Sequence, residues 1–530
     1  MNWQDLNLTW HYVEKWAAEK PTAEALVYEK ERLTWADFKK RIDMIASAYL
    51  EIGIEKGDRI ALLSAARNEF PLTYMAAGKV GAIWLGLNPK LTLDELRYQI
   101  GDARPALLFV VRSFIGNDMG DKIKTLQQEF PFMRKILVIG EPVEGTESFW
   151  DFVNKPRPDF KDAMERRSLA VRPTDEVLLL YTSGSTGKPK GVLHSHEGII
   201  ENIKAEVVNF HVNQEARCLL HFPINHVAAD TEIAFASIMV GGVIVHMEQF
   251  DPVGSLKTIE EEKITMLGQV PVMFLLQMKQ PEFFSTNFSS LRLVVFSGAS
   301  APKIMLELLS GICKNVGAML LTGYGSTEVC GFVTYSGKDD DLETLLTTAG
   351  KIVPPFELKI VDENRRELPD GQIGEIAIKG PSLFKRYLNK PKETAEVFDS
   401  EGWYYTSDLA KKGAREYITI TGRKSEMFKT GGENVYPREI EEVLETHPGV
   451  LFAAVIGVSD ELYQEVGWAF IMQMPGKETS EEELKELCQA KLANFKVPKK
   501  FFIRPLLPLL ANGKVNKLAL KEEIKEMLKD

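Results

Sequence analysis

The sequence predicts an α/β protein built on parallel, doubly wound sheets. Short apolar runs alternate with helical stretches through most of the chain, which is typical of parallel strands joined by helices. Near residues 345–420 the pattern changes to short alternating runs, which indicates an antiparallel β subdomain. Hydrophobic residues make up 45% of the 530 residues, which suits a large core rather than disorder.

Strands and helices are expected to alternate over the first part of the chain. A helix begins at Thr34, where Asp37 completes a variant of the capping box, and Gly53 ends it. Thr92 and Glu95 open a later helix in the same way. Strands are expected at Ala25–Tyr28, Ile60–Leu63, Ala82–Leu87 and Ala106–Val111.

The alternation resumes in the middle of the chain. Pro271 and Pro302 each suit the first turn of a helix, because a first-turn N–H has no partner inside the helix. Strands are expected at Val177–Leu180, Leu219–Phe222, Val243–Met247, Thr265–Val270, Leu293–Phe296 and Met319–Leu321.

The last part of the chain has a different organisation. Pro369–Gly371 is a turn signal between two alternating runs. A domain boundary is expected near Gly422, which divides the chain into a large domain, 1–422, and a small α+β domain, 423–530. In the small domain, helices are expected from Pro437 and Ser480, and strands at Ala453–Val458 and Trp468–Met472.

Composition limits the classes of function. The net charge of −11 argues against a nucleic-acid-binding surface. The four cysteines form no C-x-x-C pair, so neither a zinc nor a redox site is indicated, and free thiols suit a reducing cytosol. The most apolar stretch, Ala234–Val245, is shorter than the roughly 20 residues that span a bilayer. The first residues are polar and predict no signal peptide, so a cytoplasmic protein without stable membrane insertion is expected.

One polar loop, Tyr181–Gly191, follows an apolar run and has the composition of a phosphate-binding segment. It holds three glycines, several hydroxyls and two lysines, so backbone N–H groups and positive charge occur together. Gly184 and Gly187 are three apart and Pro189 follows Lys188, which is not the Walker A spacing. The candidate phosphate-binding residues are Thr182, Ser183, Gly184, Ser185, Thr186, Gly187, Lys188 and Lys190.

A second string, Leu321–Glu328, also follows an apolar run, where a sheet is expected to end. Open α/β sheets bind ligands at such strand ends. Tyr324 offers a flat face to an aromatic base, and Thr327 offers a hydroxyl to a phosphate. Glu328 is a hard oxygen ligand suited to magnesium. Taken alone, the string also fits a capped turn with a solvated glutamate.

Together the strings resemble those of the adenylate-forming superfamily, which comprises acyl-CoA synthetases, luciferases and peptide-synthetase adenylation domains. The resemblance covers nearly the whole chain and keeps the family's order. It implies a large domain with two doubly wound sheets and a small β-barrel-like part, then a mobile C-terminal domain. It also implies that Tyr324 stacks on adenine, that Thr327 contacts the α-phosphate, and that Glu328 and Thr182 hold Mg²⁺. Further nucleotide-lining residues implied are Gly298, Ala299, Ser300 and Gly325.

Two further strings carry the implied ribose site and hinge. Asp408 closes a string that resembles the family's ribose-binding stretch, in which the carboxylate accepts hydrogen bonds from both ribose hydroxyls. Ser407 stands where relatives usually have glycine. The resemblance places Arg423 near the ribose and phosphates, and makes Lys424 and Ser425 the hinge between the domains.

The C-terminal region carries the implied catalytic lysine and coenzyme A channel. Lys514, beside Asn512 and Gly513, matches the family's lysine, whose charge stabilises an α-phosphate under attack. Thr430, Gly431 and Gly432 match the segment that lines the pantetheine channel. The implied catalytic residues are Lys514, Thr327, Glu328 and His226, and the implied acyl pocket comprises His226, Val227, Gly323, Gly325 and Ser326.

These matches imply an AMP-forming acyl-CoA synthetase that joins a small-molecule carboxylic acid to coenzyme A, with ATP and coenzyme A as substrates and Mg²⁺ as cofactor. Gly325 stands where acetyl-CoA synthetases carry tryptophan, so an acid larger than acetate is expected. Three alternatives stay open: acyl transfer to a carrier protein or luciferase-like oxidation, a nucleotide-binding relative without catalysis, and a P-loop ATPase. A homodimer is expected at the level of the family only.

Overall fold

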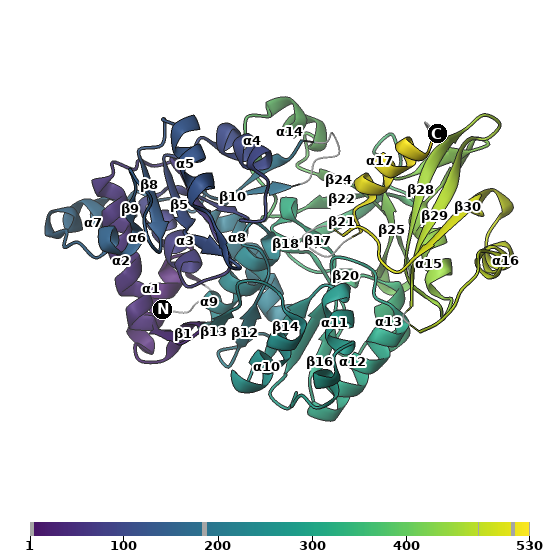
Figure 1. Cartoon of the computed structure of the whole chain (residues 1–530), viewed down its shortest axis with the longest axis horizontal. Coiled ribbons are helices and arrows are strands. Elements are labelled where there is room, and N and C mark those ends of the chain that lie inside the picture. Colours follow the sequence, from purple (N-terminus) through teal and green to yellow (C-terminus); the bar gives the residue numbers. More distant parts are fainter. Residues whose placement is uncertain (1–4, 183–187, 475, 510–514, 529–530) are drawn as a thin grey trace.

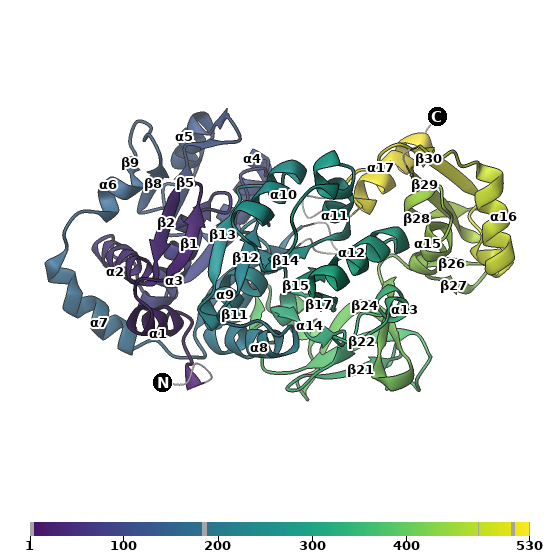
Figure 2. The same cartoon turned by 90° about the horizontal axis from the view of Figure 1, so that it is seen from below.

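Two large sheets form the body of the protein, and a smaller domain follows at the C-terminal end (Figures 1 and 2). The computed structural model describes residues 5–182, 188–474, 476–509 and 515–528. In Figure 1 the body occupies the left and centre, and the C-terminal domain, in yellow and yellow-green, lies at the right. The predicted α/β class with a separate C-terminal domain is confirmed. None of the helices in these ranges is both long and apolar enough to span a lipid bilayer.

The first sheet has seven strands in the order β16-β15-β14-β12-β13-β1-β2. Neighbouring strands from β16 to β1 are parallel, and β2 pairs antiparallel with β1 at the edge. The strand predicted at Leu219–Phe222 starts and ends two residues earlier than expected. The strands are β1 (Glu24–Tyr28), β2 (Glu31–Thr34), β12 (Arg217–Leu220), β13 (Val243–His246), β14 (Met266–Gln269), β15 (Leu293–Phe296) and β16 (Met319–Leu321).

The second sheet has eight strands in the order β23-β11-β10-β4-β3-β5-β8-β9. In this order, the six neighbouring strands from β10 through β4, β3, β5 and β8 to β9 are parallel. At the other end of the sheet, β11 pairs antiparallel with β10, and β23 pairs antiparallel with β11. The sequence did not predict β11, because polar residues such as His194 interrupt its apolar run, yet they are buried. The strands are β3 (Arg59–Leu63), β4 (Ile83–Leu87), β5 (Leu107–Val111), β8 (Lys135–Ile139), β9 (Glu147–Ser148), β10 (Glu176–Thr182), β11 (Lys190–Ser195) and β23 (Arg386–Tyr387).

Helices begin where the sequence places their caps. The Asp37 N–H donates to Thr34 Oγ1 at 3.2 Å, and the Thr34 N–H donates to the Asp37 carboxylate at 3.1 Å, which completes the predicted capping box. Pro271 is the first residue of its helix as expected, whereas Pro302 is the N-cap residue, one position earlier than expected.

The helices of the body cover the two sheets (Figure 2). They are α1 (His11–Glu19), α2 (Trp35–Glu51), α3 (Glu69–Val80), α4 (Leu93–Ala103), α5 (Gly120–Glu129), α6 (Phe149–Val153), α7 (Lys161–Leu169), α8 (His196–Asn209), the π-helix η3 (Ala228–Phe235), α9 (Ala236–Val240), α10 (Pro252–Glu261), α11 (Pro271–Met278), α12 (Lys303–Val316), α13 (Leu342–Thr347) and α14 (Pro391–Val397).

Antiparallel structure follows the first sheet, as predicted. A hairpin of β17 (Gly325–Ser326) and β18 (Gly331–Phe332) leads through β19 (Thr334–Tyr335) and β20 (Lys351–Ile352) to a four-stranded sheet. That sheet has the order β21-β22-β24-β25, with strands β21 (Glu357–Val361), β22 (Gly374–Lys379), β24 (Tyr404–Lys412) and β25 (Ile418–Arg423).

The C-terminal domain packs three helices around one mixed sheet. In its long hairpin, β29 pairs with β28 and also with both β30 and β26, which pair with different parts of β29, and β27 continues the sheet from β26. The division of the chain at Gly422 stays a prediction. The elements are β26 (Phe428–Thr430), β27 (Glu433–Val435), α15 (Pro437–Glu445), β28 (Val450–Asp460), β29 (Gln464–Gln473), α16 (Glu481–Lys491), β30 (Lys500–Arg504) and α17 (Lys517–Met527).

Candidate active site

The second string is hydrogen-bonded to residues of the second sheet and of the segment before β23. On β11, the ring Nε2 of His194 lies 2.7 Å from the carbonyl oxygen of Thr327. Burial lowers the pKa of His194 to about 4, so the ring is neutral and Nε2–H donates this bond. The Phe384 N–H donates to the Glu328 carbonyl oxygen at 2.8 Å. These bonds bring Thr327 and Glu328 beside the strand that follows the phosphate loop.

The phosphate loop leaves and re-enters the second sheet at one point. Thr182, the last residue of β10, pairs with Lys190, the first of β11. The Lys188 ammonium lies 5.9 Å from the Tyr98 ring centre, and the Lys190 ammonium lies 4.9 Å from the Tyr387 ring centre. Both lysines therefore stay near the loop. The predicted phosphate-binding residues Ser183, Gly184, Ser185, Thr186 and Gly187 lie outside the described residues.

Three residues that the sequence assigns separately to nucleotide binding are in contact: Tyr324 and Arg423 both bind the carboxylate of Asp408. The Tyr324 hydroxyl donates to Asp408 Oδ2 at 2.6 Å, and Arg423 Nε lies 3.1 Å from Asp408 Oδ1. Burial, together with the charge of Asp408, raises the pKa of Tyr324 well above its usual value, so the phenol keeps its proton. This trio joins the second string to the antiparallel sheet across 84 residues of sequence.

The predicted adenine-lining stretch is held beside Tyr324. Ser297 Oγ donates to the Gly323 carbonyl at 2.9 Å, and Gly298 follows with a φ of 85°, a left-handed conformation that favours glycine. The Thr322 hydroxyl donates to the Phe296 carbonyl at 2.7 Å. This bond joins the end of β15 to the residue that follows β16. Ala299 and Ser300 continue the stretch before α12.

Glu328 is held in a desolvated position. The Tyr387 hydroxyl donates to Glu328 Oε1 at 3.2 Å. Burial raises the pKa of the Glu328 carboxyl above its usual value, and only weaker effects oppose it. A cation beside this carboxylate offsets that cost. Within the described ranges, no cluster of three or more histidine, cysteine or acidic side chains is placed to hold a metal ion.

The predicted acyl-pocket residues lie directly before η3, directly before β17 and in β17 itself. The Ala228 N–H donates to His226 Nδ1 at 3.1 Å, and the His226 ring lies 6.4 Å from the Phe222 ring, nearly parallel to it. Val227 is buried directly before η3. These contacts orient the imidazole at the start of the helix.

The geometry of Gly325 corrects one step of the sequence argument. A Cβ at Gly325 would lie 1.9 Å from the Gly331 carbonyl oxygen, and one at Gly323 would lie 2.3 Å from the Thr334 carbonyl oxygen. Both glycines are therefore required by the close approach of the following strands. The expected open space at Gly325 is filled by β18, so this residue does not measure the size of the acid.

The predicted hinge residues are bound to the antiparallel sheet. Lys424 Nζ lies 3.1 Å from Glu375 Oε2, and the Lys424 N–H donates to the Ser407 carbonyl at 2.9 Å. The other oxygen of Glu375 accepts from the Ser407 N–H at 2.9 Å. Ser407 has a φ of 64°, so it keeps the left-handed backbone that the glycine of relatives would adopt. Ser425 follows in the turn that leads to β26.

The predicted coenzyme A segment belongs to the C-terminal domain. Thr430 Oγ1 donates to the Glu465 carbonyl at 2.9 Å, and Gly431 and Gly432 form the turn between β26 and β27. In Figure 2 this hairpin lies apart from β17, among the elements of its own domain. Thr430, Gly431 and Gly432 are thus part of a hairpin of the C-terminal domain, whereas Asp408 is in the antiparallel sheet of the body. The predicted catalytic Lys514 lies outside the described residues.

Two functional contacts come from residues that sequence reasoning missed. Tyr387 holds Glu328 from a short strand at the edge of the second sheet, and Glu375 holds the hinge from β22. Neither residue belongs to a recognisable string, and each partner is about 50 or more residues away. His196 is buried in the core, with its ring Nδ1 3.0 Å from Thr9 Oγ1.

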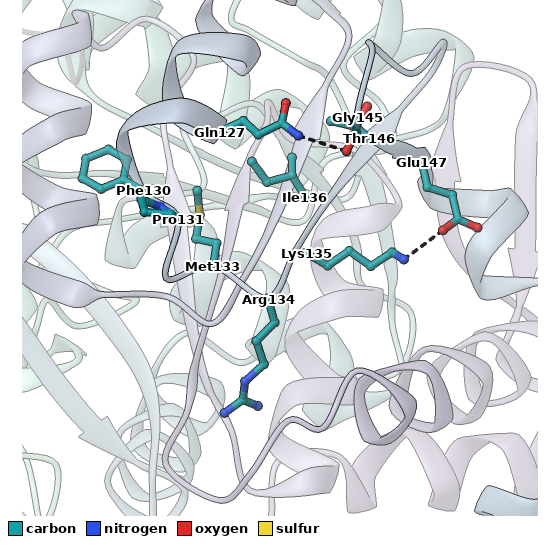
Figure 3. A pocket seen from close by; sticks show the side chains of 10 residues that line it. All are labelled: Gln127, Phe130, Pro131, Met133, Arg134, Lys135, Ile136, Gly145, Thr146 and Glu147. Atoms are coloured by element: carbon teal, nitrogen blue, oxygen red, sulfur yellow. Dashed lines mark hydrogen bonds and ion pairs between the residues drawn. The ribbon is translucent and has the colours of Figure 1, made fainter.

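Two cavities differ in their position relative to the strand ends. The larger, about 350 Å³, lies at the amino end of β8 and includes Phe130, Lys135 and Glu147 (Figure 3). This cavity is near β8 and β9, at one edge of the second sheet, whereas β11 and β23, which contact the second string, are at the other edge. The smaller, about 200 Å³, lies at the carboxyl ends of β3, β4 and β12, where Ser64, Asn88 and His221 line it. The second position is the one at which open α/β sheets bind ligands.

Comparison with known proteins agrees with this arrangement. Residues 13–388 match the family model for AMP-binding enzymes, and residues 439–514 match the model for the AMP-binding enzyme C-terminal domain. A long-chain-fatty-acid–CoA ligase of Mycobacterium tuberculosis is 31% identical, over 93% of this chain and 93% of that protein. A second ligase of that organism, whose named substrate is a methyl-dioxo-octahydroindenyl propanoyl group, is 31% identical over 96% of this chain and 97% of its own length.

A solved structure shares the whole fold. The anthranilate CoA ligase AuaEII, in complex with anthranoyl-AMP, superposes with a TM-score of 0.88 and 25% identity, over 100% of both chains. The two family models, the relatives and the shared fold confirm the resemblance found in the sequence strings. The chain belongs to the family of AMP-binding enzymes, the adenylate-forming superfamily.

Proposed function

We propose that this protein is an AMP-forming acyl-CoA ligase, which converts a carboxylic acid, ATP and coenzyme A into an acyl-CoA, AMP and pyrophosphate. The observation that carries the proposal is the meeting of Tyr324, Asp408 and Arg423 beside the string that ends at Glu328. Aromatic, acidic and basic groups that recognise base, ribose and phosphate are thereby brought together. Relatives named as CoA ligases over nearly their whole length support the reaction class.

The first step joins the acid to the nucleotide. The acid's carboxylate attacks the α-phosphorus of ATP, which forms acyl-AMP and releases pyrophosphate. Asp408 orients the ribose, Tyr324 covers the base, and the lysines at the phosphate loop, Lys188 and Lys190, neutralise phosphate charge. Lys514 stabilises the charge that grows on the α-phosphate during attack.

Glu328 fits a magnesium site. Its carboxylate is a hard oxygen ligand in a desolvated position, and Mg²⁺ in nucleotide enzymes is usually held by one or two carboxylates and by phosphates. Thr182, the last residue of β10, is the second candidate ligand from the sequence. When bound there, Mg²⁺ neutralises charge on the phosphates. His226 lies beside the incoming carboxylate, at the start of η3.

The second step requires a different position of the C-terminal domain. Thr430, Gly431 and Gly432 are on a hairpin of the C-terminal domain, and in this proposal a rotation about Lys424 and Ser425 brings them to the acyl-AMP. The same rotation withdraws Lys514. The thiolate of coenzyme A then attacks the acyl carbonyl, and AMP leaves. Release of Lys424 from Glu375 accompanies this movement.

The acid is larger than acetate. The support for this comes from the relatives and not from Gly325. Their named substrates are long-chain and alicyclic, and the structural neighbour binds an aromatic acyl-AMP. An enzyme that delivers the acyl group to a carrier protein remains the alternative, since the adenylation step is the same. A cytoplasmic location and a homodimer stay predictions.

The products of a complete reaction test the proposal. With a panel of acids, ATP, Mg²⁺ and coenzyme A, we expect equal amounts of AMP, pyrophosphate and a thioester, measured by chromatography and mass spectrometry. A reaction that releases orthophosphate and ADP would contradict it. AMP formation without a thioester would favour the carrier-protein alternative.

A further inference from the structure

Two side chains of α4 bind the two ends of the phosphate loop. β10 and β11 are an antiparallel pair, so Tyr181 lies before the loop and Pro189 lies at its return. The Tyr98 hydroxyl donates to the Pro189 carbonyl oxygen at 2.8 Å, and the Tyr181 hydroxyl donates to Asp102 Oδ2 at 2.7 Å. Tyr98 and Asp102 are four positions apart, which places them one helical turn apart on one face of α4. One face of a single helix therefore contacts both ends of the loop.

Each of these bonds has a defined donor. Burial, and then the hydrogen bond to Asp102, raise the pKa of Tyr181, so its phenol keeps the proton that it donates. At the other end, Pro189 has no N–H, so its carbonyl oxygen is the one hydrogen-bonding group that it offers, and Tyr98 supplies the donor. The Tyr98 ring also lies edge-on to the Tyr181 ring at 6.4 Å, and its centre is 5.9 Å from the Lys188 ammonium. These contacts fix the two ends of the loop relative to each other.

The second oxygen of Asp102 connects the loop to the strand that holds Glu328. Asn389 Nδ2 donates to Asp102 Oδ1 at 3.1 Å and to the Asp102 carbonyl oxygen at 3.0 Å. Tyr387, two residues before Asn389, donates to Glu328, and its ring centre lies 4.9 Å from the Lys190 ammonium. The Asp102 carboxylate thus accepts from the entry of the phosphate loop on one side and from the end of β23 on the other.

The group that this loop is suited to bind is the pyrophosphate part of ATP. The resemblance assigns the α-phosphate to Thr327 and Lys514, which leaves the two lysines at the loop for the β- and γ-phosphates. A binding segment that is already held in its bound conformation loses less entropy when the ligand arrives. We propose that Tyr98 and Asp102 are positioning residues for the adenylation step: they keep the ends of the phosphate loop in place against β23, so that its lysines meet the pyrophosphate part of ATP beside Glu328. This inference rests on the proposed function, since it adds two residues to that step.

Two single substitutions test the two contacts. Tyr98→Phe removes the hydroxyl and keeps the ring, and Asp102→Asn removes the charge and places an amide N–H₂ against one of two donors. We expect KM for ATP to rise about 3- to 10-fold in Tyr98→Phe and about 10-fold or more in Asp102→Asn, because fewer molecules of the free enzyme have the loop ends in place. The value of kcat should stay within about 3-fold, since saturating ATP restores the bound conformation. Acid-dependent ATP–pyrophosphate exchange with ATP varied measures both constants.

A second readout separates positioning from general stability. Acyl-AMP and AMP carry no β- or γ-phosphate, so their binding does not depend on the lysines at the loop. Thioester formation from preformed acyl-AMP, and the Kd of AMP measured by calorimetry, should stay within about 2-fold of the unaltered values in both variants. The calorimetric Kd of ATP with Mg²⁺ should rise by the same factor as KM. A side chain that only stabilises the fold would change all of these values together or none of them.

Tyr417→Phe is the matched control. The Tyr417 hydroxyl donates to Asp340 Oδ1 at 2.6 Å in the antiparallel region of the body, and the residue is half-buried like Tyr98. The variant removes a tyrosine hydroxyl of similar burial, so its melting temperature should fall about as much as that of Tyr98→Phe. Its ratio of the Kd for ATP to the Kd for AMP should equal that of the unaltered protein.

The outcomes for the two proposals differ. Folded Tyr98→Phe and Asp102→Asn proteins that keep the unaltered KM and Kd for ATP would overturn the inference, and so would an equal weakening of ATP and AMP. If Asp102→Asn does not fold, Tyr98→Phe, which loses one half-buried hydroxyl, decides alone. Failure of the unaltered protein to catalyse exchange with any acid would instead overturn the proposed function. The comparison of ATP with AMP by calorimetry needs no acid, so it still tests the two residues of α4.

Discussion

Replacing Lys514 by alanine is expected to lower the rate of acid-dependent ATP–pyrophosphate exchange by about 100- to 1,000-fold, the usual loss when a group that stabilises transition-state charge is removed. The lysine supplies positive charge to the α-phosphate only while it is attacked. Thioester formation from preformed acyl-AMP should stay within a few-fold of the unaltered rate, because Lys514 is withdrawn in that step. Rapid-quench measurement of the two half-reactions checks both statements.

The control for Lys514→Ala is a lysine that lies near it in the sequence. Lys525 is on the exposed side of α17 and pairs with its helix neighbour Glu522, so Lys525→Ala should leave both half-reactions unchanged. A Lys514→Ala protein with full exchange activity would contradict the catalytic role. Equal losses in both half-reactions would contradict the two positions of the C-terminal domain.

Asp408→Asn is expected to lower kcat/KM for ATP by about 10- to 100-fold. The carboxylate accepts from Tyr324 at 2.6 Å and pairs with Arg423 at 3.1 Å, and the proposal also gives it the ribose. Each charged hydrogen bond contributes about 1.5–3 kcal/mol, so loss of the charge weakens all three contacts together. Steady-state kinetics with ATP varied, and calorimetric binding of AMP, measure the effect.

A second tyrosine–aspartate pair provides the comparison for Asp408→Asn. Asp399 accepts from the Tyr405 hydroxyl at 2.7 Å in the same antiparallel region, away from the nucleotide residues. Asp399→Asn should lower the melting temperature but leave KM for ATP unchanged. If Asp408→Asn changes KM no more than Asp399→Asn does, Asp408 acts in the fold and not on the nucleotide.

Local sequence predicts most of the elements of this fold. Buried parallel strands are continuous apolar runs, as at Ile83–Leu87, and capping residues such as Thr34 act within three positions of one another. β11 was missed, because its polar His194 is satisfied only by the distant carbonyl of Thr327. Local patterns carry no information about such a partner.

The sequence predicts which residues belong to the candidate site but not which of them contact one another. The sequence strings identify Tyr324, Asp408 and Arg423 separately. Only the fold shows that the Asp408 carboxylate binds the side chains of both Tyr324 and Arg423. Gly325 shows the opposite error. Its absent side chain was interpreted as space for an acid, whereas β18 fills that space. The meaning of a glycine depends on which backbone approaches it.

The most direct measurement of the central claim is exchange of radiolabelled pyrophosphate into ATP, with acids from acetate to palmitate, benzoate and cyclohexane carboxylate. The account predicts exchange that requires both Mg²⁺ and one class of acid larger than acetate, and that disappears in Lys514→Ala. Folded protein that binds ATP but shows no exchange with any of these acids, or that releases orthophosphate, would contradict the assignment of this protein as an AMP-forming ligase.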